Sequence, residues 1–119
     1  MSVTCGWWTG RRDALLGALA RELLLWGEDV LDDPGAGEIA TLLADVAERT
    51  AADRRDPVLG EASLLLDRAA RECARADRFL GGFLPQVVRH LRTALGLLQQ
   101  ARRLLMERQI DHGGVPVAH

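Results

Sequence analysis

The sequence predicts an all-α protein, an antiparallel four-helix bundle with a short Trp-containing N-terminal lead and a flexible C-terminal tail. Its apolar residues are dominated by Leu and Ala, which favour helix, whereas Ile and Phe occur only twice each. In four stretches the apolar residues recur every three or four positions, and breaks containing Gly or charged residues separate these stretches. A length of 119 residues predicts a single domain, which we place at 1–112, followed by a tail at 113–119.

The first nine residues show no helical periodicity and contain two adjacent tryptophans, Trp7 and Trp8. They are expected either to cover one end of the bundle as a lid or to form an exposed anchor for a partner, since Trp is enriched at binding hot spots. The first helix is expected to begin at a Thr9 cap and to end near Leu31. Its apolar stripe consists of Leu16, Leu19, Leu23, Trp26 and Val30.

The second helix is expected from about Glu38 to Ala52, after the break at Asp32-Asp33-Pro34-Gly35. Its stretch Glu38–Leu43 resembles the first helix of a helix-turn-helix. In that motif a Gly-containing turn follows, but this chain has Ala44-Asp45, and these residues do not force a turn. We therefore predict one continuous helix.

The third helix is expected to begin at Asp56-Pro57, an N-cap followed by proline in the first turn, and to end before Gly81-Gly82. The fourth, Phe83 to Met106, has the longest uninterrupted pattern, which only Arg102 breaks. Gly113-Gly114 is expected to end the ordered chain. The apolar stripe of the fourth helix comprises Leu84, Val88, Leu91, Leu95, Leu98 and Leu105.

Two features of the fourth helix are candidate partner surfaces. Leu97 and Leu104 lie beside the main stripe, either as the flank of the core or as a second helix-packing surface. Arg89, Arg92 and Arg103 share another face. These arginines are expected either to pair with acids of the first two helices or simply to be solvated on the outer face, or else to bind phosphate or an acidic partner. A pI near 5.9 argues against general nucleic-acid binding.

Signatures of catalysis and of metal binding are missing from the sequence. It contains no Glu-x-x-His, HExxH, P-loop or GxGxxG motif, so no catalytic residue, metal ligand or cofactor is assigned. The Arg-x(4–6)-His motif of HEPN nucleases is not satisfied at His90 or His112. We expect His90 to be partly buried and hydrogen-bonded, and Cys73 to be a small buried apolar residue.

The sequence therefore predicts a small non-enzymatic helical module that binds another protein or a second copy of itself, as an adaptor, chaperone-like or assembly component. The alternative is a nucleic-acid-associated accessory or regulatory protein that uses the Arg face. The lack of Lys, Asn and Tyr indicates a GC-rich bacterial genome. The apolar run after Arg11-Arg12 is too short for an export signal, and no stretch is long enough to span a bilayer, so a cytoplasmic location is expected.

Overall fold

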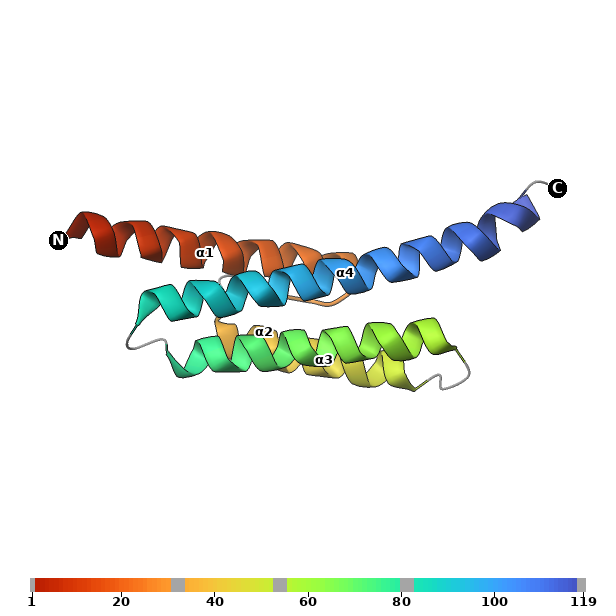
Figure 1. The fold of residues 1–119 in the computed structure, drawn as a ribbon, viewed down its shortest axis with the longest axis horizontal. Coiled ribbons are helices and arrows are strands. Elements are labelled where there is room, and N and C mark those ends of the chain that lie inside the picture. Colours follow the sequence, from red (N-terminus) through yellow and green to blue (C-terminus); the bar gives the residue numbers. More distant parts are fainter. Residues whose placement is uncertain (1, 31–33, 53–55, 80–82, 118–119) are drawn as a thin grey trace.

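The computed structural model describes residues 2–30, 34–52, 56–79 and 83–117. This part of the chain contains four α-helices and the residues that flank them. The helices are α1 (Ser2–Leu25), α2 (Ala36–Ala51), α3 (Pro57–Arg78) and α4 (Leu84–Val117) (Figure 1). The predicted all-α, four-helix fold is confirmed. The helix α2 is continuous, as predicted from the absence of a turn at Ala44-Asp45.

Local chemistry explains where α3 begins and where α1 ends. The Asp56 Oδ1 atom accepts a hydrogen bond from the Val58 amide at 2.9 Å, and Pro57 is the first helical residue, as predicted. The helix α1 ends at Leu25 because Gly27 adopts a φ of +83°, which a residue without a Cβ takes without strain. The Glu28 amide then donates to the Leu23 carbonyl at 3.1 Å, as in a Schellman motif.

The outer ends of α1 and α4 differ from the prediction. The helix α1 begins at Ser2, so the backbone of the predicted lead is helical and Thr9 lies inside the helix instead of capping it. No proline occurs in residues 2–9, and nothing in the backbone stops the helix there. The helix α4 continues to Val117 through Gly113-Gly114, since glycine weakens a helix by about 1 kcal/mol without breaking it. A flexible tail at 113–119 stays a prediction.

The direction of α1 also differs from the prediction. The helix α3 runs antiparallel to α2 and α4, but α1 runs in the same direction as both of them (Figure 1). Glu22 of α1 contacts Arg102 of α4, and Trp26, which directly follows α1, lines the same surface depression as Leu105 of α4. The α1–α2 connection is ten residues long, 26–35. At about 3.3 Å per residue it can return along α2, so a strictly antiparallel order is not required.

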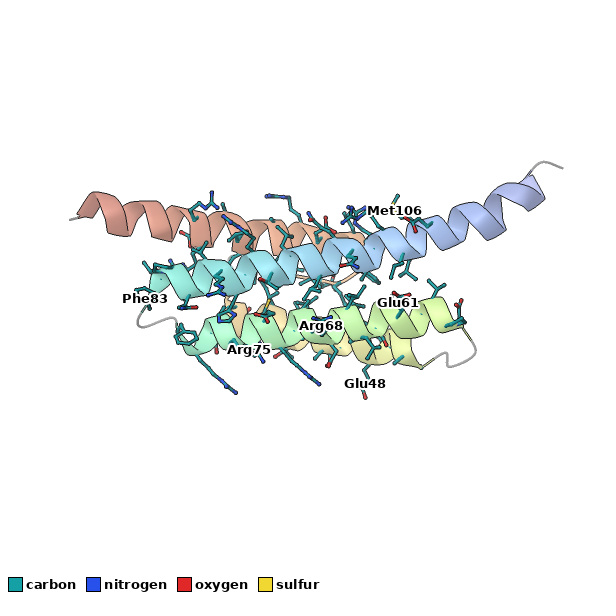
Figure 2. The ribbon with its side chains drawn as sticks, viewed as in Figure 1. Glu48, Glu61, Arg68, Arg75, Phe83 and Met106 are labelled. Carbon is teal, nitrogen blue, oxygen red and sulfur yellow. The ribbon has the colours of Figure 1, made fainter. Side chains whose placement is uncertain are left out.

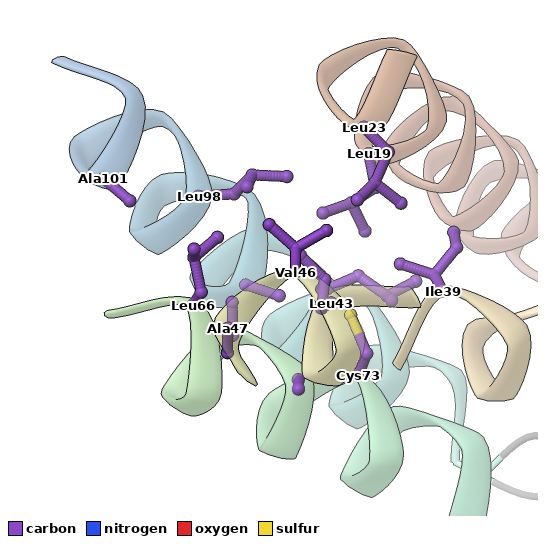
Figure 3. Close-up of a cluster of buried hydrophobic side chains, with 14 of the residues drawn as sticks. Leu19, Leu23, Ile39, Leu43, Val46, Ala47, Leu66, Cys73, Leu98 and Ala101 are labelled. Atoms are coloured by element: carbon purple, nitrogen blue, oxygen red, sulfur yellow. The ribbon is translucent and has the colours of Figure 1, made fainter. Parts of the chain in front are cut away.

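The core lies between all four helices and is built from Leu, Ile, Val, Ala and Cys73 (Figure 3). The helix α3 packs extensively on α2 and on α4, whereas α1 packs mainly on α4 and touches α2 only locally. As a result, α1 is the least covered of the four helices. Its largest fully buried side chains are Leu19 and Leu23, and those of the other helices are Ile39, Leu43, Leu66, Cys73, Val87, Leu91 and Leu98.

The molecule is elongated, with extents of 62 × 26 × 22 Å. The N-terminal part of α1 and the C-terminal part of α4 extend beyond the other helices at opposite ends of the bundle (Figure 1). Among the described residues, no helix combines the length and the apolar character needed to cross a membrane.

Candidate functional site

The three arginines predicted to form a partner face lie together on the outer side of α4. Arg89, Arg92 and Arg103 are exposed, and none of their guanidinium groups forms a hydrogen bond or ion pair with another residue whose side chain is described. Arg89 and Arg92 are about one turn apart, and Arg103 follows about 16 Å further along the helix. The structure therefore brings them to one surface, and the predicted pairing with acids of α1 and α2 is not found among the described side chains.

A different arginine of α4 makes the ion pair with α1. Arg102 Nε donates to Glu22 Oε2 at 2.8 Å, and its second terminal nitrogen, Nη2, donates to Oε1 at 3.3 Å. The Glu22 side chain is only 11% exposed. This bidentate pair lies at the α1–α4 interface. This pair was not predicted from the sequence, although each residue interrupts an apolar stretch of its helix.

The predicted apolar partner contacts have different positions in the structure. Leu97 and Leu104 are partly buried and pack against the core, which supports their interpretation as its flank. The side chains of Trp7 and Trp8 lie outside those that the structure describes. A role in partner binding stays a prediction for all four residues.

The larger exposed apolar side chains occur on α1, on α3 and near the ends of the described part of α4. On α1, Leu24 is 56% exposed and Leu25 is 66% exposed. Leu64 of α3 is also 66% exposed, but its neighbours on the outer side of that helix, Glu61 and Arg68, are charged. Phe83, which directly precedes α4, lies far from Met106 of α4 (Figure 2). Among the described side chains, only α1 has two large apolar residues exposed at consecutive positions of a helix.

We call the uncovered side of α1 the α1 outer face. Its positions follow the helical repeat from the start of the described side chains to the end of the helix. Apart from two opposite charges, Asp13 and Arg21, its residues are small or apolar: Gly10, Ala14, Gly17, Leu24 and Leu25.

His90 is partly buried and hydrogen-bonded, as predicted. Its Nδ1 atom lies 2.6 Å from Glu72 Oε2, and Arg75 donates to the other Glu72 oxygen at 3.0 Å. The Phe79 ring stacks on the imidazole at a centroid distance of 5.8 Å. The carboxylate comes from α3, eighteen positions earlier in the chain, so inspection of the sequence around His90 could not find it. The cluster links α3 to α4.

Cys73 is fully buried beside this cluster and faces the core. Burial raises the pKa of its thiol from 9.0 to about 12, and the neighbouring Glu72 carboxylate adds to the increase. The thiol is therefore protonated at neutral pH and is a poor nucleophile.

This thiol predicts a loss of stability at alkaline pH. Above pH 9.0 the unfolded chain releases the Cys73 proton, whereas the folded chain holds it until about pH 12. The unfolded state then binds fewer protons, so the free energy of unfolding falls as pH rises through this window and does not change below it. The expected decrease between about pH 8 and about pH 10.5 is about 2 kcal/mol.

Urea unfolding at the two pH values measures this change. The chain contains no Lys and no Tyr, so its two thiols are the only side chains with ordinary pKa values between about 8 and 11. Cys73→Ala should remove this fall in the free energy of unfolding. Cys5→Ser should retain the fall, because Cys73 is still present. The same dependence in Cys73→Ala would contradict the prediction.

An open depression at the α2–α3 end of the bundle is lined by Trp26, Val46, Arg49, Thr50, Leu59 and Leu105. The Trp26 Nε1 atom is buried and has no acceptor among the described residues. No group of three or more His, Cys, Asp and Glu within the described part of the chain is placed to hold a metal ion.

Comparison with known proteins gave no match to a family model, to a curated protein or to a solved structure, so the surfaces of this chain are the basis for assigning a function.

Proposed function

We propose that this protein is a small non-enzymatic helical interaction module and that the α1 outer face is its docking surface. The observation that carries this proposal is that α1 is apolar around more of its circumference than the bundle covers. Leu19 and Leu23 are buried on one side, while Leu24 and Leu25 are exposed on the other. Neighbouring apolar side chains that are exposed together often mark a protein-interaction surface. A partner on the outer face supplies the missing cover.

The proposed partner is another protein or a second copy of this chain, and the proposed role is that of an adaptor, a chaperone-like protein or an assembly component. A helix laid against another helix through apolar anchors one turn or less apart is a common mode of protein recognition. We place the protein in the cytoplasm as part of this proposal.

Replacing both exposed leucines tests the docking surface. Leu24→Glu combined with Leu25→Glu is expected to abolish capture of a stoichiometric protein partner by the tagged chain at high salt, because charges on the outer face oppose apolar burial. Leu64→Glu is the matched control, since Leu64 is as exposed as Leu25 but lies on α3. Equal loss with both variants, or with neither, would count against α1 as the docking surface.

The exposed arginines of α4 favour a second candidate function, binding of nucleic acid. Replacing Arg89, Arg92 and Arg103 by Gln is expected to weaken an oligonucleotide complex and to lower its log–log salt slope by up to about 2.7 on duplex DNA. The matched control replaces three arginines of α3: Arg68, Arg71 and Arg78. Fluorescence anisotropy against salt concentration measures the slope. Absence of any salt-sensitive complex removes this candidate.

A further inference from the structure

We propose that the α1 outer face binds a second copy of this chain, with the two α1 helices antiparallel and Gly17 of each at the centre of the contact. This inference rests on the proposed function, because it names the partner of the same surface. Three observations carry it: the open space at two glycines, the exposed leucine at one end of the face, and the positions of two opposite charges.

The glycines of the face leave room for another helix. Among the residues whose side chains are described, a Cβ added at Gly10 would meet nothing within 4 Å, and one added at Gly17 would meet only the Nη1 atom of Arg21, at 3.7 Å. Neither glycine has the positive φ seen at Gly27. Packing and backbone conformation within the chain therefore do not require these glycines, each of which weakens a helix by about 1 kcal/mol relative to Ala. A bare backbone allows a neighbouring helix to approach closely.

An antiparallel register centred on Gly17 makes the face complementary to itself. In this register, a residue seven positions after Gly17 in one copy lies opposite the residue seven positions before Gly17 in the other. Leu24 of one copy therefore faces the open space at Gly10 of the other. Positions four residues away also lie level, which brings Arg21 to Asp13 of the other copy. Arg21 is exposed and has no ion-pair partner among the described side chains. Asp13 is 62% exposed and pairs only with the adjacent Arg12, at 3.1 Å, in that part of the chain.

The same charges disfavour a parallel contact. In a parallel pair Arg21 lies level with Arg21 of the second copy, and Leu24 meets Leu24 while the space at Gly10 remains open. Like charges at one level repel, so the parallel arrangement loses both complementarities. The charge and size pattern of the face thus selects a second copy in the antiparallel orientation.

Sedimentation equilibrium across a wide range of protein concentration tests the association. The expected mass at high concentration is twice the 13.0 kDa of the chain. Gly17→Leu is expected to raise the dissociation constant of the dimer at least about tenfold, because the side chain blocks the close approach. Gly96→Leu is the matched control. An added Cβ at this exposed glycine of α4 would meet no described atom within 4 Å, and its replacement should leave the dimer unchanged.

Helicity and thermal unfolding show that the variants still fold. Both leucines have a higher helix propensity than glycine, so neither variant should lose helical circular dichroism. A folded Gly17→Leu variant that dimerises as well as wild type would overturn the proposal.

Reversing the two charges tests the register. Arg21→Asp and Asp13→Arg are each expected to weaken the dimer at least about tenfold, since each places like charges level with one another. The two together should restore it, because every pair is then opposite again. If the double variant remains as weak as the single ones, the antiparallel register is wrong.

A chain that stays monomeric at every concentration also overturns the inference. If that monomer still captures a protein partner at high salt, and loses it with Leu24→Glu and Leu25→Glu but not with Leu64→Glu, the proposed function stands and only the identity of the partner was wrong. If the monomer captures no such partner, both proposals fail.

Discussion

Replacing Leu43 with Ala is expected to lower the free energy of unfolding by about 2–5 kcal/mol. Leu43 is fully buried on α2 and belongs to the cluster that joins all four helices (Figure 3). Removal of its terminal carbons loses apolar burial and leaves a cavity that packed helices close only in part. A domain of this length has a total stability on the order of 6–18 kcal/mol, so the loss would be a large share of it.

Urea unfolding followed by circular dichroism measures this change, and Leu64→Ala is its control. Leu64 is 66% exposed on α3, and Ala favours helix, so that substitution is expected to change stability by less than about 0.5 kcal/mol. Equal effects at the two positions would contradict the core described here.

Arg102→Leu is expected to lower the free energy of unfolding by about 2–4 kcal/mol. The substitution leaves the Glu22 carboxylate, only 11% exposed, without its bidentate partner at the α1–α4 interface. Glu22→Leu should cost less, because the Arg102 side chain is 34% exposed and its charged end can turn toward water.

The double variant, with both residues replaced by Leu, distinguishes the interaction between the two side chains from the contribution of each side chain alone. It should recover most of the stability lost by Arg102→Leu, since two apolar side chains then face each other where the charges stood. A double-mutant cycle measured by urea unfolding gives the coupling energy. Additive effects of the two single substitutions would show that the pair does not interact.

The elements that could be predicted are those set by neighbouring residues. The start of α3 follows from Asp56 and Pro57, and the buried side of α4 follows from the spacing of its apolar residues. The first helix was predicted to end near Leu31, before the break at 32–35, but it ends at Leu25. Gly27 ends it earlier by adopting a left-handed conformation, which glycine can adopt but which its presence in a sequence does not predict.

The features that could not be predicted depend on which helices become neighbours. The pattern of α1 does not indicate its direction, because a connection of this length permits either orientation. The Glu22–Arg102 pair and the contact of His90 with Glu72 each join two helices, so no spacing along the chain indicates them. The arginines of α4 were placed correctly on one face by the helical repeat, but their lack of described partners could be found only in three dimensions.

The peripheral position of α1 has a consequence for the order of folding. The helices α2, α3 and α4 form two successive hairpins, whereas α1 joins α4 through contacts such as Glu22–Arg102, eighty positions apart. Closing that long loop has a large entropic cost until the rest of the bundle offers a surface. We therefore expect α1 to dock last and to detach first, as a separate cooperative unit in native-state hydrogen exchange. A partner bound to the α1 outer face would then hold in place the helix that otherwise detaches first, so binding should stabilise α1 more than the other helices.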